Sequence, residues 1–193
     1  MTSPIRSLKQ AARVECRRRR DAAAAAHPHA AALLRDSFLA ALDPAPGTVI
    51  SGYWPIGSEI DVRPLLHHLA ARGQGLALPV VVGPGQPLRF RAWVPGTALE
   101  PAGLGLSVPP AESPEVDPAM LLVPLLGFDR RGGRLGYGGG FYDRTLARLR
   151  AAGPVLAVGV GFAAQELPLV PRDRFDQRLD WLVTESFALK TEP

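Results

Sequence analysis

The sequence predicts an α/β protein of three layers, with helices on both faces of a mostly parallel sheet. Three observations support this class. Short apolar runs of strand length alternate with segments of helical periodicity. Hydrophobic residues make up 47% of the 193-residue chain, which is enough to bury a sizeable core. A glycine-rich stretch follows one apolar run and precedes a helical segment, the position at which α/β sheets commonly bind ligands.

The N-terminal part is predicted to begin with helix. Residues 7–42 are rich in Ala, Arg and Leu and contain no glycine, so they form either one long helix or two helices separated near His27 and His29. Residues 48–53 are a short β-branched and aromatic run between turn residues, which is typical of a buried strand. Residues 62–72 have apolar side chains at helical spacing and are followed by glycine, a common end of a helix.

The middle of the chain is predicted to contain three more strands. Residues 76–82 form an apolar run. Residues 88–94 alternate Leu, Phe, Ala and Val with Arg, Arg and Trp, as a half-exposed strand does. Residues 95–118 are dense in Pro and Gly and are expected to be an ordered loop across the surface, and residues 120–124 form a short apolar strand.

The last third returns to alternating elements. Residues 141–150 are predicted to form a helix, and residues 155–162 and 181–184 are predicted strands, the latter being the last strand of the chain. Strands that alternate with helices favour a Rossmann-like sheet. Neither an internal repeat nor a long linker interrupts the sequence, so residues 1–193 are predicted to be one domain with a basic helical segment at residues 1–42.

The basic charge is concentrated at the N-terminus. Residues 1–20 hold seven basic side chains and one acidic residue, Glu15, so that, with a net charge of +4, the rest of the chain carries about −2. The run Arg17–Arg20 is therefore interpreted as the solvated face of a helix, because no known nucleic-acid-binding motif accompanies it. Binding of nucleic acid through this run is the competing hypothesis, which a steep salt dependence of binding would reveal.

Composition also limits the compartment and the partners. Cys16 is the only cysteine, which excludes an internal disulfide or a cysteine-based zinc cluster and favours the reducing cytoplasm. No stretch approaches the ~20 consecutive apolar residues of a membrane helix. We therefore expect a cytoplasmic monomer that binds neither nucleic acid nor a membrane. The four histidines lie in predicted helical regions and receive no chemical role.

The glycine-rich stretch at residues 132–143 predicts an anion site. Glycines let backbone N–H groups approach an anion closely, and the N-terminus of the following helix adds about half a positive charge. Arg134 and Arg144 can add fork-shaped donors suited to phosphate. The stretch is not a P-loop, because no Gly-Lys-Ser/Thr follows the glycines, and Phe141 replaces the last glycine of the dinucleotide-binding fingerprint.

Two aspartates, Asp129 and Asp143, bracket this stretch. A hard cation such as Mg²⁺ prefers carboxylate oxygens, so both are candidate ligands for a metal beside the phosphates. The alternative for both is capping of a turn or of the first turn of the helix.

The same stretch carries a family resemblance. Residues 122–129 (LVPLLGFD), followed by residues 133–144 (GRLGYGGGFYDR), resemble the signature of the 5-formyltetrahydrofolate cyclo-ligase family. Lys9 to Arg13 is similar to the family's Lys-x-x-Leu-Arg opening. The similarity covers nearly the whole chain and includes residues 51–61, 78–81, 90–93, 176–180 and 183–185. The chain departs from the pattern at Ala12, at Phe141 and at Phe175, where the family usually has leucine, tyrosine and histidine.

The resemblance implies a small cytoplasmic α/β enzyme that converts 5-formyltetrahydrofolate to 5,10-methenyltetrahydrofolate while it hydrolyses ATP to ADP and phosphate with Mg²⁺. It implies that Asp143 and Asp176 bind the metal, that Tyr53 and Glu59 face the folate, and that Arg134 and Lys9 are catalytic. The residues implied to bind ATP are Lys9, Arg13, Arg134, Leu135, Gly136, Tyr137, Gly138, Gly139, Gly140, Phe141 and Tyr142.

The implied reaction has a chemical reason to need cations. The oxygen of an N-formyl group leaves poorly, so ring closure requires its activation, which attack on the γ-phosphate of ATP achieves. N10 then closes on the carbon and phosphate leaves. Arg134, Lys9, Arg13 and Mg²⁺ would supply positive charge around the transferred group. No protein nucleophile is needed, in keeping with the lack of an evident Ser-His-Asp or Cys-His arrangement in the sequence.

The folate residues also admit simpler interpretations. Glu59 follows a predicted strand and has the position of a helix-start residue, although its carboxylate could also accept ring N–H groups of a pterin. Tyr53, Trp54 and Trp93 could be core aromatics instead of the walls of a pocket. The same fold and phosphate loop could also serve a different small substrate, because a fold does not fix a function.

Overall fold

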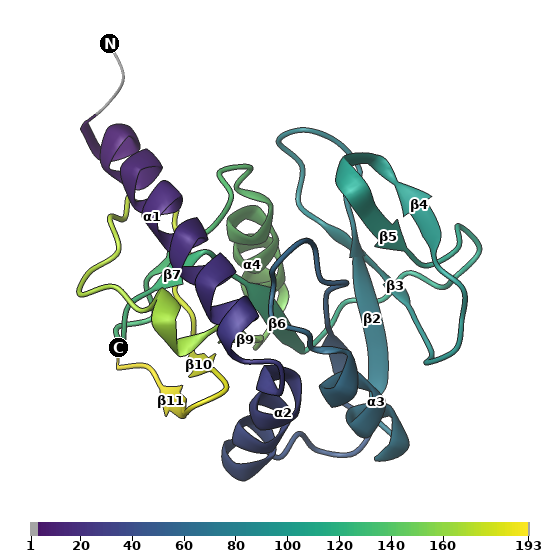
Figure 1. Cartoon of the computed structure of the whole chain (residues 1–193). Coiled ribbons are helices and arrows are strands. Elements are labelled where there is room, and N and C mark those ends of the chain that lie inside the picture. Colours follow the sequence, from purple (N-terminus) through teal and green to yellow (C-terminus); the bar gives the residue numbers. More distant parts are fainter. Residues whose placement is uncertain (1–3, 193) are drawn as a thin grey trace.

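The computed structural model describes residues 4–192 and has a seven-stranded sheet at its centre (Figure 1). The five inner strands pair in parallel, and both edge strands pair antiparallel to their neighbours. The predicted mixed but mostly parallel α/β sheet is therefore confirmed. In spatial order the strands are β11 (Ala188–Lys190), β10 (Trp181–Val183), β9 (Leu156–Val160), β6 (Met120–Pro124), β1 (Val49–Ser51), β2 (Gly75–Val80) and β3 (Arg89–Ala92).

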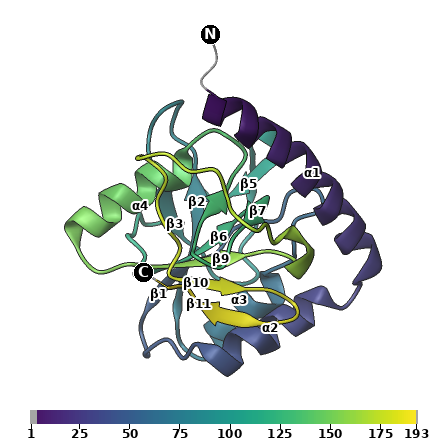
Figure 2. The same cartoon turned by 90° about the vertical axis from the view of Figure 1, so that its left-hand side faces the viewer.

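Helices cover both faces of the sheet, and Figure 2 shows α4 (Phe141–Ala152) on one side with α1 (Pro4–Ala26) and α2 (Ala30–Ala41) on the other. Strand β6 shows how alternation along a strand produces this arrangement. Its Leu121 and Val123 pack in the cluster that contains Leu146 of α4. Leu122 points the opposite way and packs in the cluster that contains residues of α2 and α3 (Arg63–Ala71). A sheet buried on both faces explains why its strands read as continuous apolar runs.

The N-terminal segment forms two helices, which confirms the second of the two predicted alternatives. Helix α1 ends at Ala26 and α2 begins at Ala30. Pro28 between them has no backbone N–H and disfavours helical backbone at His27, the residue before it. Helix α1 runs along the outside of the molecule (Figure 1). Its charged residues can therefore reach loops at one edge of the sheet.

Two expectations about short strands were wrong, and a third pair of short strands was not predicted. Residues 95–118 are not simply a loop: β4 (Glu100–Ala102) and β5 (Leu106–Val108) form a hairpin around a single 3-10 turn. Residues 181–184 do not contain the last strand, because β11 follows and pairs with β10. A small ribbon that was not predicted pairs β7 (Gly127–Phe128), which precedes the glycine-rich stretch, with β8 (Arg134–Leu135), which lies within it.

The physical reason is common to all three. These strands are two or three residues long, and their ladders depend on a partner that local sequence does not reveal. For β11, the turn is set by Thr184, whose hydroxyl accepts the backbone N–H groups of Ser186 (3.1 Å) and Phe187 (3.0 Å).

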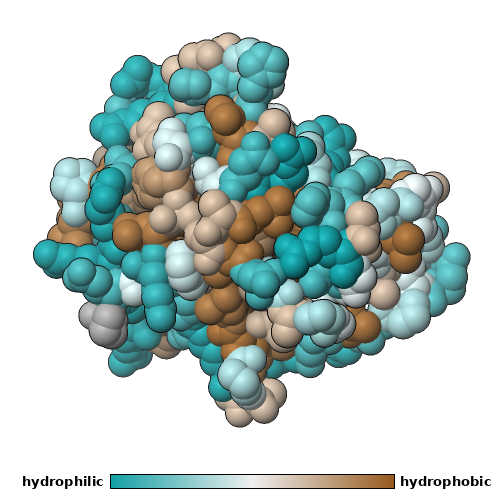
Figure 3. All heavy atoms as spheres, turned by 90° about the horizontal axis from the view of Figure 1, so that it is seen from below, coloured by the Kyte–Doolittle hydropathy of each residue, from teal (hydrophilic) through white to brown (hydrophobic). Residues whose placement is uncertain are grey.

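The lower face of the molecule carries hydrophobic residues in a narrow central band with hydrophilic residues on either side (Figure 3). Leu33 of α2 is one of the large hydrophobic side chains that remain partly exposed. Within residues 4–192, no helix is both long and apolar enough to cross a membrane.

Candidate active site

A cavity of about 940 Å³ opens at the carboxyl ends of β1, β2 and β6, between α1 and the start of α4. This is the edge of an open α/β sheet at which ligands bind. The volume lies at the upper end of the range for small-molecule sites. The hairpin of β4 and β5 contributes Leu106 and Ser107 to the wall, so the segment expected to be a plain loop takes part in shaping the cavity.

The glycine-rich loop forms one wall of the cavity and leads from β8 into α4. Gly138 has φ +105° and Gly140, the N-cap of α4, has φ +66°, both in the left-handed region that favours glycine. No side chain caps α4, so the N–H groups of its first turn stay free beside the cavity. The loop thus presents backbone donors and the positive end of a helix dipole to a ligand, as an anion site requires.

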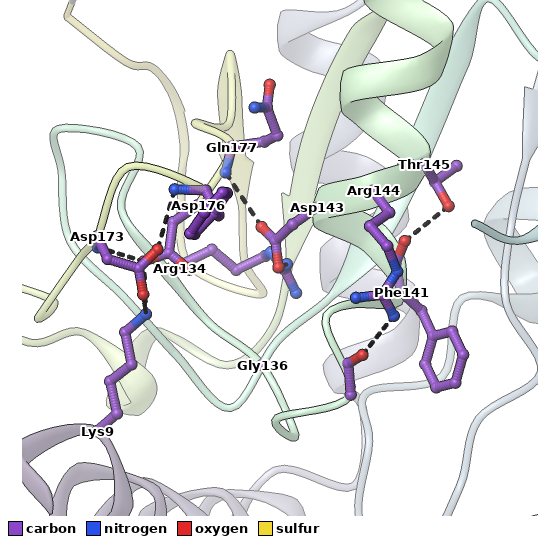
Figure 4. A network of polar contacts seen from close by, with 12 residues as sticks. Lys9, Arg134, Gly136, Phe141, Asp143, Arg144, Thr145, Asp173, Asp176 and Gln177 are labelled. Carbon is purple, nitrogen blue, oxygen red and sulfur yellow. Dashed lines mark hydrogen bonds and ion pairs between the residues drawn. The ribbon is translucent and has the colours of Figure 1, made fainter. Parts of the chain in front are cut away.

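Arg134 lies behind this loop and is almost completely buried. Its Nη2 donates to Oδ2 of Asp143 at 2.9 Å (Figure 4). Its guanidinium lies 5.8 Å from the centre of the Tyr142 ring. Its Nε has no hydrogen-bond partner among the described residues. A buried N–H group without an acceptor is unfavourable, so the Nε–H of Arg134 is a candidate donor to a ligand in the cavity that this residue lines.

Helix α1 places a row of cations on the opposite wall. Lys9, Arg13, Arg17 and Arg20 all line the cavity, because steps of three and four residues return to the same face of a helix. Arg13 Nε donates to the carbonyl of Gly136 at 2.9 Å, which ties the helix to the glycine-rich loop.

Lys9 is held between two carboxylates. Its Nζ lies 2.8 Å from Oδ2 of Asp173 and 2.6 Å from Oδ2 of Asp176 (Figure 4). Burial lowers the pKa of Lys9, but its hydrogen bonds to both aspartates and their negative charges outweigh this effect and leave the pKa above its ordinary value. Lys9 is therefore a permanent cation whose charge is balanced from within the protein.

The arginine run divides according to helical position. Arg18 and Arg19 form ion pairs with Glu15 at 2.9 and 2.8 Å and belong to the outer face of α1, as predicted for a solvated face. Arg17 is exposed where it lines the cavity, whereas Arg20 turns inward and its side chain is only 8% exposed. The interpretation of the whole run as a solvated face was therefore wrong for Arg20.

Tyr53 and Glu59 line the cavity from the segment that follows β1. Tyr53 follows β1, is buried, and donates its hydroxyl to the carbonyl of Ile60 at 2.9 Å. Glu59 accepts the Tyr137 hydroxyl at 2.5 Å and the backbone N–H of Ile56 at 2.9 Å. Burial raises the pKa of Glu59, and the hydrogen bonds from Tyr137 and Ile56 offset this only in part. The site thus contains aromatic and carboxylate groups as well as cations.

The structure brings together the residues to which the family resemblance gives a role in binding or catalysis. Lys9, Arg13, Tyr53, Glu59, residues 134–143 and Asp176 all line this one cavity.

Asp129 is different. It is buried and accepts the backbone N–H groups of Arg131 (3.0 Å), Gly133 (2.9 Å) and Val170 (2.8 Å). It organises the turn before β8, so of its two predicted roles turn capping is the one that its contacts fit.

Among the charged residues of the cavity, sequence reasoning missed Arg17, Arg20, Asp173 and Arg174. The spacing of Arg17 and Arg20 relative to Lys9 and Arg13 on one helix face was the signal that could have indicated the first two. Asp173 had no such signal, because it lies in an irregular segment that only the fold brings to Lys9.

Comparison with known proteins agrees with this geometry. The model of the 5-formyltetrahydrofolate cyclo-ligase family matches residues 5–185. The 5-formyltetrahydrofolate cyclo-ligase of Mycolicibacterium smegmatis is 40% identical over 138 residues, which are 66% of this chain and 70% of that protein. The enzyme of the same name from Haemophilus influenzae is 30% identical over 136 residues, again 66% of this chain and 70% of that protein.

A solved structure is similar over almost the whole length. The NMR structure of 5,10-methenyltetrahydrofolate synthetase from Aquifex aeolicus has a TM-score of 0.75 and 27% sequence identity. The match covers 96% of this chain and 94% of that one. The structure of a 5,10-methenyltetrahydrofolate synthetase from Mycoplasma pneumoniae shares the fold, with a TM-score of 0.72 and 23% sequence identity. That match covers 92% of this chain and 98% of the other.

Proposed function

Because this chain belongs to the 5-formyltetrahydrofolate cyclo-ligase family and is therefore a ligase, we propose that it converts 5-formyltetrahydrofolate to 5,10-methenyltetrahydrofolate with ATP and Mg²⁺, releasing ADP and phosphate. The observation that carries the proposal is the composition of one continuous cavity. A glycine-rich loop with buried and helical cations lines one end, and a buried carboxylate with aromatic side chains lines the other. Such a cavity suits a phosphorylated nucleotide next to a ring with N–H donors.

The cationic end is the proposed phosphate site. Arg134 supplies the buried donor that lacks a partner, and Lys9 and Arg13 approach from α1. The remaining donors are backbone N–H groups of residues 134–142. Phosphoryl transfer requires mainly positioning and positive charge around three equatorial oxygens, and Arg134 and Lys9 are the proposed catalytic cations.

Asp143 and Asp176 are the proposed Mg²⁺ ligands, and their surroundings fit this ion. Within residues 4–192 no three His, Cys, Asp or Glu side chains gather closely enough to hold a metal alone. Mg²⁺ typically takes one or two carboxylates and completes its coordination with phosphates and water. Gln177, next to Asp176, donates its backbone N–H to Asp143 at 3.1 Å, which brings the segment that carries Asp176 to the start of α4. When bound, the ion would neutralise charge on the phosphates.

The other end is the proposed folate site. Each oxygen of Glu59 accepts one protein hydrogen bond, so each has a further lone pair for an N–H group of the pterin ring. Tyr53 packs beside it with its hydroxyl already bonded, so it offers mainly the apolar surface of its ring. The pterin would then place its N5-formyl group toward the glycine-rich loop.

The proposed chemistry proceeds in two steps. The formyl oxygen attacks the γ-phosphorus in line, which forms an O–P bond and breaks the bond to the ADP oxygen. N10 then attacks the activated carbon, its N–H proton is released, and the C–O bond breaks as phosphate leaves. Lys9 and Arg134 stabilise the transferred group without forming a bond to it. No side-chain nucleophile takes part, and Cys16 is buried in a different cluster with Leu126, Leu135 and Val170.

Turnover of the purified protein tests this proposal. With Mg·ATP and 5-formyltetrahydrofolate we expect methenyltetrahydrofolate absorbance to appear, and no product without ATP. Arg134→Met should abolish most of the turnover. Arg148→Met is the matched control, because Arg148 is on the outer face of α4, paired with Asp117, and should remain active. ATP binding in well-folded protein without any turnover of this folate would refute the assignment of substrate.

A further inference from the structure

We propose that Arg20 is a positioning residue for the folate end of the cavity, which orients the hydroxyl of Tyr137 so that Glu59 is presented to the substrate as an ionised carboxylate. This inference rests on the proposed function, in which Glu59 receives the pterin. It gives a role to a member of the arginine run that has no contact with the glycine-rich loop except through Tyr137.

Arg20 is buried at the junction of three segments. Its Nε donates to Ser58 Oγ at 2.9 Å, and its Nη1 donates to the hydroxyl of Tyr137. The same Nη1 lies 3.9 Å from Oε1 of Glu59. The Arg20 and Glu59 side chains are only 8% and 5% exposed, so water screens this interaction weakly.

The donors and acceptors in this cluster fix the direction of every hydrogen bond. Arginine has only donors, so the oxygen of Tyr137 must accept from Arg20 and can donate only its own proton. That proton goes to Oε1 of Glu59, 2.5 Å away. Ser58 likewise accepts from Arg20 and donates its hydroxyl proton to Asp21. With Arg20 in place, the hydroxyl proton of Tyr137 points to Glu59, which favours the ionised carboxylate over the protonated form.

The arrangement matters because Glu59 is under opposing influences. Burial raises its pKa, while the hydrogen bonds from Tyr137 and Ile56 and the charge of Arg20 lower it. Tyr53 and Tyr142 also face it and carry no charge, because burial raises the pKa of both hydroxyls. Arg20 is thus the one cation that acts on Glu59 within the described part of the chain. Without it, the carboxylate would hold its proton to a higher pH.

A purely structural role would have a different signature. The guanidinium of Arg20 also lies 5.7 Å from the centre of the Tyr137 ring and joins α1 to the 58–59 segment, so its removal will lower stability in either case. Only the positioning role predicts that the pH dependence of folate binding changes. The two roles can therefore be separated by a binding measurement across pH.

The test is the affinity of the full-length protein for 5-formyltetrahydrofolate, without nucleotide, measured by calorimetry at several pH values. Arg20→Met removes the donors and keeps the aliphatic stem. We expect about tenfold weaker binding at neutral pH, the effect of one charge-assisted hydrogen bond, and a shift of the acidic limb of binding to higher pH. Arg20→Lys, which keeps the charge without the fork, should fall between Arg20→Met and wild type.

Two further variants keep the result interpretable. Arg18→Met changes the exposed neighbour on the same helix and should leave folate binding unchanged. Tyr137→Phe removes the hydrogen bond to Glu59 and should shift the acidic limb in the same direction, which tests the proposal even if Arg20→Met does not fold. An unchanged pH dependence in the Arg20 variants and in Tyr137→Phe would overturn the inference. Failure of wild type to bind this folate would instead refute the proposed function.

Discussion

Arg134 is the residue from which the phosphate site can be tested quantitatively. Its Nε is a buried donor without a partner among the described residues, and such a group costs about 1–3 kcal/mol. A phosphate oxygen that accepts this hydrogen bond would recover that free energy on binding. At about 1.4 kcal/mol per factor of ten, Arg134→Met should weaken ATP binding by roughly 5- to 150-fold.

The same substitution has a cost for folding that must be separated from its effect on binding. Asp143 keeps only the backbone N–H of Gln177 when Arg134 is removed, and its side chain is 18% exposed. We expect a loss of about 1–3 kcal/mol in unfolding free energy and, for a chain of this length, a decrease in Tm of roughly 2–4 °C per kcal/mol. Arg134→Met/Asp143→Asn removes both charges and should recover part of the Tm.

Calorimetric titration with ATP in the presence of a chelator is the decisive assay, because without Mg²⁺ the two aspartates have no metal to bind. The single and double variants of Arg134 should both lose ATP affinity, although the double variant regains stability. Wild-type affinity for ATP in folded Arg134→Met would refute the reasoning that this orphan donor belongs to a phosphate site.

Three other changes have defined outcomes. Glu59→Gln should weaken folate binding about tenfold at neutral pH and remove the loss of binding at acidic pH. Because burial raises the pKa of this carboxyl, its ionisation opposes folding above that pKa. The variant should therefore be at least as stable as wild type at neutral pH, which thermal melts across pH check. Gly138→Ala forces a side chain to φ +105°, at a cost of about 1–3 kcal/mol, and should weaken ATP binding. Gly153→Ala is the control: it lies at φ 171° with open space around it and should leave the ATP affinity unchanged in the same titration. Asp176→Asn should raise the Mg²⁺ concentration for half-maximal rate by roughly tenfold or more, and also free Lys9 from one ion pair; an unchanged Mg²⁺ requirement would exclude it as a ligand.

Local signals in the sequence predicted most of the sheet and the glycine-rich loop. The strand at residues 120–124 and the helix that begins at residue 141 have strong apolar patterns and an obvious glycine boundary, and both occur as predicted. The loop between them was assigned to anion binding from its glycines and arginines, and the structure places it at the wall of the cavity.

The features that escaped prediction depend on contacts between distant segments. Nothing in the local sequence tells whether Arg20 faces solvent or Tyr137, which is 117 positions later. The pairing of Lys9 with Asp173 is likewise a product of the fold, as is the pairing of β11 with β10. The cytoplasmic location, the monomeric state and the division into one domain stay predictions.

The most direct test of the proposed reaction follows the formyl oxygen itself. Wild-type protein would be given 5-formyltetrahydrofolate with ¹⁸O in the formyl group and Mg·ATP, and the released phosphate analysed by mass spectrometry. Attack of the formyl oxygen on the γ-phosphorus predicts one ¹⁸O atom in each phosphate, with one ADP for every methenyltetrahydrofolate. Phosphate without the label, in the presence of product, would contradict the account.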